Sequence, residues 1–119
     1  MYACFVGIDI GKWNHQAAFL NSSDNQVSAE LSFANTSEGF DLLTQSLDSF
    51  DKETTVIGME ATGHYWLALH DFLSGEGWDV KVINPIQTDA MRKVNIRKTK
   101  TDRRDAVLVA DVIRFNRYT

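Results

Sequence analysis

The sequence predicts an α/β fold, a mixed sheet with helices on both faces and the element order β-β-β-α-β-α-β-α. Residues 3–10 and 54–60 are apolar at successive positions, which fits central strands covered on both faces. Residues 27–33 alternate apolar with polar side chains, as a half-buried strand does. Segments with helically spaced apolar residues separate the later strands. At 119 residues the chain is expected to form one domain, 1–119.

The first three strands are expected to form an antiparallel meander. Residues 16–20 supply the second strand, and the turn-forming segment 21–25 separates it from the third. Thr36 or Ser37 fits the N-cap of the first helix, because short hydroxyl side chains accept a bond from its free amides. The apolar face of that helix would consist of Phe40, Leu43, Leu47 and Phe50.

The second half of the chain alternates helices with strands. We expect a helix over 63–74, a strand over 78–84 that Pro85 ends, and a last helix over 101–116. Residues 86–100 are ambiguous between a helical turn and a basic loop.

Acidic residues stand at the ends of the two central strands. Asp9 ends the first and Glu60 ends the fourth. A helix links these strands, so they should be parallel, with their carboxyl ends at the edge where open α/β sheets bind ligands. Asp9 alone also fits a cap of the following turn, whereas Glu60 is unfavourable at the end of a buried strand without a partner.

Two further acids, Asp102 and Asp105, open the last helix at i, i+3 spacing. At about 100° per residue, the apolar Ala106, Val109 and Ile113 lie within roughly 40° of Asp102, and Asp105 lies about 60° to the other side. Both carboxylates should then face the sheet. The alternative is that they face water and complement the helix dipole. The side chains expected to point outward are Arg103, Arg104, Asp111 and Arg114.

Four carboxylates in one place repel each other unless cations neutralise them, so the arrangement predicts a divalent metal site. Such a site can hold two ions roughly 3.5–4 Å apart, the spacing used for phosphoryl transfer. Oxygen ligands favour Mg²⁺ or Mn²⁺ over zinc. The lone Cys4 lies in an apolar run and is read as a buried hydrophobic residue. His15, His64 and His70 are read as surface or second-layer residues, with His64 the one able to reach the site.

Charge is unevenly distributed along the chain. The net charge is −4, but residues 92–104 hold seven cations and one acid, which gives this stretch +6 and the rest −10. A basic stretch beside acids suits a phosphodiester enzyme, in which cations hold the nucleic-acid backbone. A solvated basic loop is the alternative. The candidate nucleic-acid contacts are Lys12, Arg92, Lys93, Arg97, Lys98, Lys100, Arg103 and Arg104.

Four segments together resemble a known family: residues 7–12 (GIDIGK), 58–66 (GMEATGHYW), 84–85 (NP) and 100–106 (KTDRRDA). They are similar to the N-terminal domain of the DEDD-type insertion-sequence transposases, a group that includes Piv-like DNA invertases and RNA-guided recombinases. The resemblance covers essentially the whole chain. It implies a RuvC-like, RNase H-type fold. It also implies that the catalytic, metal-binding carboxylates are Asp9, Glu60, Asp102 and Asp105.

The resemblance further implies metal-dependent cleavage and transfer of DNA strands in transposition and site-specific recombination. The implied partners are DNA, a structured guide RNA, and further copies of the chain in the full-length protein. Members of the family continue into a C-terminal domain that bears a serine thought to take part in cleavage. This chain stops at Thr119, so it is expected to be a fragment that is not autonomously active.

The main alternative is a non-catalytic DNA- or RNA-binding module, which would use the basic stretch and keep the acids as remnants or structural caps. Two other classes of protein fit less well. An actin-like ATPase would need a second phosphate loop, and a proofreading exonuclease would have Asp-x-Glu where this chain has Asp9-Ile-Gly11. No apolar stretch approaches the ~20 residues of a membrane span, and a signal peptide is not apparent. The chain is therefore expected to be cytoplasmic, without membrane contact.

Overall fold

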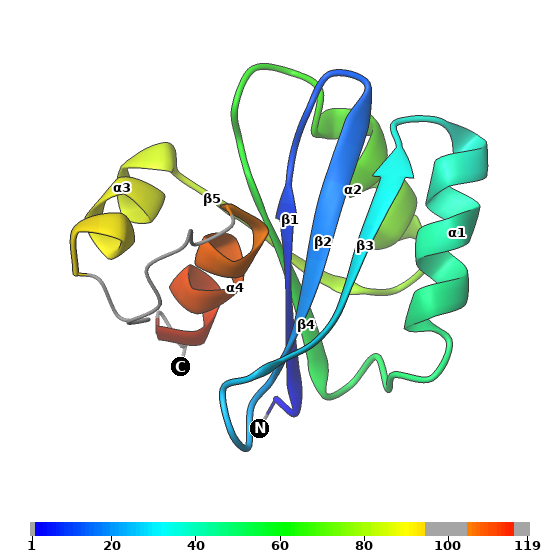
Figure 1. Ribbon diagram of the computed structural model, residues 1–119. Helices are drawn as coiled ribbons and strands as arrows, with labels where there is room; N and C mark the ends of the chain where they lie inside the picture. The colour runs from blue at the N-terminus through cyan, green and yellow to red at the C-terminus, as the bar shows by residue number, and fades with distance from the viewer. Residues whose placement is uncertain (1, 95–104, 116–119) are drawn as a thin grey trace.

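The computed structural model describes residues 2–94 and 105–115, which form one five-stranded sheet with helices packed on it (Figure 1). The strand order is β3-β2-β1-β4-β5. The strands are β1 (Cys4–Asp9), β2 (Asn14–Asn21), β3 (Val27–Ala34), β4 (Thr55–Glu60) and β5 (Asp79–Ile83). The helices are α1 (Ser37–Leu47), α2 (Leu67–Gly75), α3 (Pro85–Val94) and α4 (Asp105–Phe115).

The predicted sheet is confirmed. Strands β1, β2 and β3 form an antiparallel meander, and β4 runs parallel to β1 on its other side. The central position of β1 explains why its side chains are apolar on both faces. The segment 21–25 makes the predicted turn between β2 and β3, with Asn25 in the left-handed region (φ 59°) and its amide donating to the Asn21 carbonyl at 2.8 Å.

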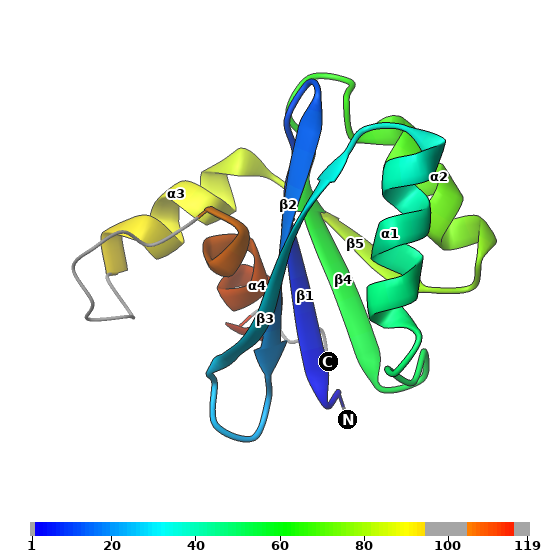
Figure 2. The ribbon, with the colours of Figure 1, turned by 45° about the vertical axis from the view of Figure 1, so that its right-hand side comes forward.

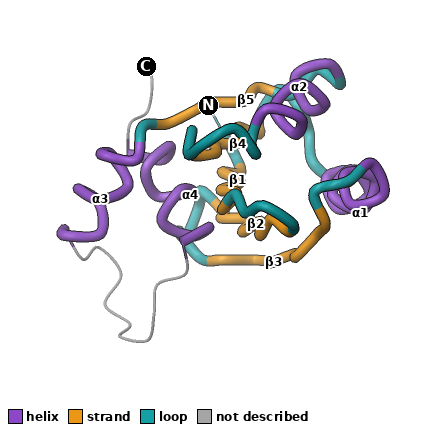
Figure 3. The backbone as a smooth tube through the Cα atoms, turned by 90° about the horizontal axis from the view of Figure 1, so that it is seen from above, coloured by secondary structure: helices purple, strands orange, loops and turns teal. Residues whose placement is uncertain are grey.

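Helices cover both faces of the sheet, as predicted: α1 and α2 lie on one side, and α3 and α4 on the other (Figures 2 and 3). Two apolar cores result. Cys4, Val6 and Ile8 of β1 pack into the core beneath α1 and α2. Phe5, one position out of phase, packs into the core beneath α4. Because side chains alternate along a strand, Asp9 shares its face with Phe5 and therefore with α4.

The first two helices begin at residues that their chemistry explains. Thr36 is the N-cap of α1, and its hydroxyl accepts a bond from the Gly39 amide at 3.1 Å. Helix α2 begins at Leu67 rather than at the predicted residue 63. Gly63 has a φ of +63°, which an α-helix excludes, so residues 63–66 form a turn before the helix.

The segment left ambiguous in the sequence begins with a full helix. Pro85 does not merely end the preceding strand: it is the first residue of α3, a position where its missing N–H costs no helical hydrogen bond. The helix continues to Val94 and adds one element to the predicted order. Met91 of α3 packs against the core beneath α4. Helix α3 therefore covers the side of α4 that faces away from the sheet.

That extra layer overturns one prediction about α4. Asp111 was expected to point outward into water, but it is only 1% exposed. Every residue from Ala106 to Ile113 is buried, because α4 lies between the sheet and α3. Arg114 donates to the Asp111 carboxylate at 3.2 Å, which offsets the cost of burying that charge.

Among the described helices, none has the length and apolarity that a membrane crossing requires.

Candidate active site

Asp9 and Glu60 lie side by side at the carboxyl edge of the sheet. The parallel register pairs Ile8 of β1 with Met59 of β4, and the two acids are the next residues along each strand. Both are half-buried. Alternation along β4 places Glu60 on the α4 face, as it places Asp9 along β1. The predicted neighbourhood of these two carboxylates is thus present in the fold, and the Thr62 hydroxyl donates to Glu60 at 3.2 Å.

Glycines in the two central strands bring α4 onto the same edge. A Cβ on Gly7 would lie 2.1 Å from the Ala106 carbonyl oxygen and 2.3 Å from the Ala110 amide nitrogen. The backbones of β1 and α4 are therefore in direct contact, which only a glycine allows. Gly58 of β4 makes room for a side chain of α4, because a Cβ there would lie 2.6 Å from a methyl group of Ile113. Asp105 directly precedes Ala106, so this contact sets the first turn of α4 beside Asp9.

The pKa of Asp9 also indicates that the carboxylates of Asp105 and Glu60 lie near it. Its pKa is raised above the ordinary value, first because burial disfavours the charged form and then because the Asp105 and Glu60 carboxylates repel it. The Arg92 guanidinium opposes this shift. Carboxylates from β4 and α4 therefore act on Asp9 of β1 through space.

Arg92 is the counter-ion of this cluster, a role that sequence reasoning missed. It extends from the last turn of α3, and its Nη1 donates to Oδ1 of Asp105 at 3.0 Å. Both side chains are about half exposed, at 50% and 51%. The two residues lie thirteen positions apart in the sequence, on different helices, and no local sequence pattern indicates their contact.

The chemistry of these groups suits a hard divalent cation. Carboxylate oxygens are the ligands that Mg²⁺ and Mn²⁺ prefer, and mutual repulsion among three acids is relieved when a cation binds. Within residues 2–94 and 105–115, no three His, Cys, Asp or Glu side chains are arranged to hold an ion as they stand. The predicted fourth acid, Asp102, lies outside the described residues.

Some of the predicted nucleic-acid contacts lie within the described residues and some lie outside them. Lys12 is exposed on the β1–β2 connection, and Arg92 and Lys93 are exposed on α3. Lys12 lies shortly after Asp9 in the sequence. Arg92 contacts Asp105 directly. The remaining predicted cations, Arg97, Lys98, Lys100, Arg103 and Arg104, lie outside the described residues.

Of the two positions expected for His15, surface or second layer, the structure excludes the surface. It is 2% exposed, packed edge-on against Phe33 with ring centroids 5.4 Å apart. The Gly11 amide donates to its Nδ1 at 3.2 Å, so the imidazole braces the connection that follows Asp9. Burial lowers the pKa of His15, with partial opposition from the Asn35 side chain. His64, expected to be the histidine able to reach the site, is exposed and stacks on Tyr65 at 4.4 Å.

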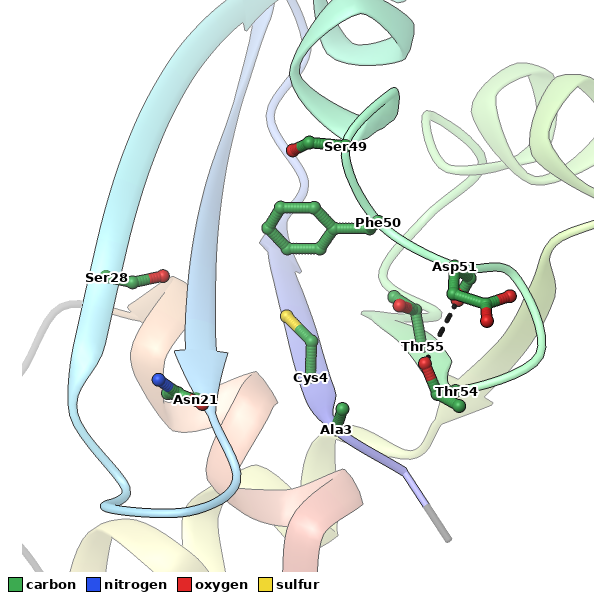
Figure 4. A pocket seen from close by; sticks show the side chains of 9 residues that line it. All are labelled: Ala3, Cys4, Asn21, Ser28, Ser49, Phe50, Asp51, Thr54 and Thr55. Carbon is green, nitrogen blue, oxygen red and sulfur yellow. Dashed lines mark hydrogen bonds between the residues drawn. The ribbon is translucent and has the colours of Figure 1, made fainter.

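A separate pocket of about 370 Å³ opens at the other end of the central strands (Figure 4). Its walls are Ala3, Cys4, Asn21, Ser28, Ser49, Phe50, Asp51, Thr54 and Thr55. Burial raises the pKa of the Cys4 thiol to about 11, so this sulfur stays protonated and is a poor nucleophile. Asp51 is the single charged residue in the pocket wall. The pocket is therefore chemically unlike the carboxylate edge, the end of the sheet that carries Asp9 and Glu60.

Comparisons with known proteins identify the family of the chain and its fold. Residues 6–119 match the IS110-type DEDD transposase family. The chain is 32% identical over 112 residues to the pilin gene-inverting proteins of Moraxella lacunata and Moraxella bovis, which covers 92% of the chain and 34% of each relative. It thus spans about a third of the length of these curated relatives.

Solved structures resemble the fold. T. thermophilus RuvC, solved with a Holliday junction substrate, superposes with a TM-score of 0.71 at 13% identity, covering 96% of this chain and 94% of that one. The fowlpox virus Holliday junction resolvase gives 0.53 at 16% identity, covering 94% and 95%. The fold is therefore RuvC-like and RNase H-like, and the chain belongs to the IS110-type DEDD transposase family.

Proposed function

We propose that this chain is the metal-dependent strand-cleaving domain of a DNA transposase or site-specific recombinase. Its family acts in DNA recombination, and the relatives that it matches are named for inverting a pilin gene. The observation that carries the proposal is the convergence of acids from three elements, Asp9, Glu60 and Asp105, at the carboxyl edge of a RuvC-like sheet. Asp102 is the fourth proposed member.

In this proposal the four carboxylates hold two Mg²⁺ or Mn²⁺ ions. Bound there, the ions would polarise the scissile phosphate and lower the pKa of the attacking hydroxyl or water. The residues of the chain do the rest. The Gly7 contact with α4 keeps the backbone that carries Asp105 close to the backbone that carries Asp9. Arg92 is paired with Asp105 and would be free to contact a DNA phosphate if Asp105 held a cation instead.

The partners follow from the same proposal. DNA is the substrate, held by Lys12, Arg92, Lys93 and the cations of the 92–104 stretch. A structured guide RNA and further copies of the protein are proposed for the longer polypeptide in which this domain works. The same stretch would serve a binding module that lacks catalysis, so metal dependence is the property that separates the two functions.

DNA affinity with and without metal tests the proposal. Without metal the acids repel DNA, so Mg²⁺ should tighten binding of the chain to a labelled duplex. Asp9→Asn should bind more tightly than wild type in EDTA and should lose most of its response to Mg²⁺. Asp41→Asn, which removes an exposed acid on α1, is the matched control and should behave as wild type. Affinity that responds neither to metal nor to Asp9→Asn would favour the non-catalytic binding module instead.

In the longer protein the prediction is sharper. Asp102→Asn should abolish recombination, because the amide cannot provide the charge that holds a divalent ion. Recombination that survives this change would contradict the catalytic assignment of Asp102.

A further inference from the structure

The connection between β1 and β2 carries an exposed tryptophan beside the carboxylate edge. Trp13 is 71% exposed, although an indole ring is among the most costly apolar groups to leave in water. It follows Asp9 by four residues. Figure 1 shows this connection at the same end of the sheet as the connection that follows Glu60 in β4. The ring is therefore exposed to solvent on a connection at the end of the sheet where Asp9 and Glu60 lie.

The backbone beneath Trp13 is held in place. The Asn35 amide donates to the Trp13 carbonyl at 2.8 Å, and the Asn35 side chain donates to the Lys12 carbonyl at 3.4 Å. On the other side of the connection, the Gly11 amide donates to the buried His15 ring. These bonds tie the connection to β2 and to the segment after β3. A fixed backbone presents the indole in a narrow range of positions, which lowers the entropic cost of binding through it.

Lys12 supplies a cation to the same feature. Its Nζ lies 4.9 Å from the centroid of the Trp13 ring, within the range of a cation–π contact. An aromatic face next to an ammonium group matches one repeating unit of a nucleic acid, in which a base lies beside a phosphate. Base–aromatic stacking is largely independent of sequence, because every base has a π face.

We propose that Trp13 stacks on an unpaired base of DNA next to the strand held at the carboxylate edge, with Lys12 contacting the adjoining phosphate. The inference rests on the proposed function and adds a positioning residue to it. Strand exchange needs bases that have left their original duplex, and a fixed indole gives such a base a surface to stack on. The acids would hold the backbone through metal, and Trp13 would hold the base.

Oligonucleotide affinity tests this inference. The chain would be titrated, by fluorescence anisotropy, into a labelled single-stranded DNA, a continuous duplex, and an RNA strand of the same sequence, each in EDTA and again with Mg²⁺. Trp13→Ala should weaken binding to the single strand about tenfold or more and should change duplex binding little. Trp13→Phe should recover most of the loss. Leu42→Ala, which removes an exposed apolar side chain from α1, is the matched control and should leave all affinities unchanged.

Salt dependence separates the two residues of the pair. Lys12→Gln should reduce the slope of log affinity against log salt by about 0.7 for the single strand, because one phosphate contact is lost. Trp13→Ala should weaken binding without changing that slope.

Three outcomes would overturn the inference: equal single-strand affinity of Trp13→Ala and wild type, an equal loss on the continuous duplex, or a Trp13-dependent gain on RNA alone. Its failure is distinguishable from failure of the proposed function. Failure of the inference would be seen with the Trp13 variants in EDTA. Failure of the proposed function would be seen in the response of Asp9→Asn to Mg²⁺.

Discussion

Asp9 lies in surroundings that disfavour its charge. Burial and the carboxylates of Asp105 and Glu60 raise its pKa, and the Arg92 guanidinium offsets part of that effect. A group whose folded pKa is raised binds protons more readily in the folded state. The metal-free fold therefore loses stability as the pH rises from the ordinary value of 3.8 through the raised pKa of Asp9. Asp9, a proposed metal ligand, is therefore also a residue whose charge lowers the stability of the metal-free fold.

Replacing Asp9 with asparagine should remove that cost. In EDTA at neutral pH, Asp9→Asn should unfold at a temperature a few degrees above wild type, and the advantage should shrink as the pH falls towards 3.8. Thermal unfolding followed by circular dichroism measures it, with Asp41→Asn as a control that changes nothing. A variant less stable than wild type in EDTA would show that Asp9 is not repelled by its neighbours.

His15 gives the opposite pH dependence. Burial lowers its pKa, so the folded state binds a proton less readily than the unfolded chain, whose histidine titrates near 6.5. Stability contributed by neutral His15 is complete above that pH and is lost as the pH falls through it towards the lowered folded pKa. Protonation would also end the bond that Nδ1 accepts from Gly11.

His15→Phe should abolish this sensitivity while keeping the ring against Phe33. Urea unfolding on either side of pH 6.5 should show wild type losing more free energy of unfolding on acidification than the variant. Identical losses in the two proteins would mean that His15 is not held neutral by the fold.

Helix α4 is the element on which the site depends. The backbone of α4 packs directly on Gly7 of β1. The first turn of α4 carries Asp105. Helix α3 covers it from outside and provides Arg92. The geometry of the carboxylates is thus set by how closely a helix approaches a strand.

A methyl group at position 7 should disturb that approach. Gly7→Ala places a Cβ 2.1 Å from a backbone oxygen, which cannot move aside as a flexible side chain would, so α4 must shift. The free energy of unfolding should fall by roughly 1–3 kcal/mol, the typical cost of overpacking a core. The response of DNA affinity to Mg²⁺ should also weaken.

Gly75→Ala is the matched control for this change. A Cβ there meets nothing within 4 Å, at the end of α2, so stability should stay within about 1 kcal/mol of wild type. Chemical denaturation of both variants decides the matter. Equal stabilities would mean that α4 does not press on β1 at Gly7.

Sequence reasoning reached those features that local patterns determine. The apolar runs, the Thr36 cap and the turn at 21–25 follow from short-range chemistry, and the pairing of Asp9 with Glu60 follows from parallel strands. Features that depend on distant segments were missed. The burial of Asp111 depends on α3, and the contact of Arg92 with Asp105 joins two helices. The local sequence of α4 carries no information about what packs on its outer side.

At the scale of the whole molecule, charge is separated into a basic stretch of +6 and a remainder of −10. Lys98→Ala with Lys100→Ala should therefore weaken DNA binding equally for all sequences. It should also flatten the salt dependence by about 0.9 in slope for each lysine that contacts a duplex phosphate. Affinities for two unrelated duplexes over a salt series test this. A loss confined to one sequence would assign these lysines to base recognition instead.

The four proposed carboxylate ligands should form one metal site, which a Mg²⁺ and Mn²⁺ titration followed by backbone amide NMR would detect. Wild type should show saturable changes confined to the surroundings of Asp9, Glu60, Asp102 and Asp105, with the strongest Mn²⁺ broadening there. Asp102→Asn should remove most of them, and Asp41→Asn should leave them intact. Changes scattered over all exposed acids, or localised changes that Asp102→Asn leaves untouched, would contradict the proposed metal site.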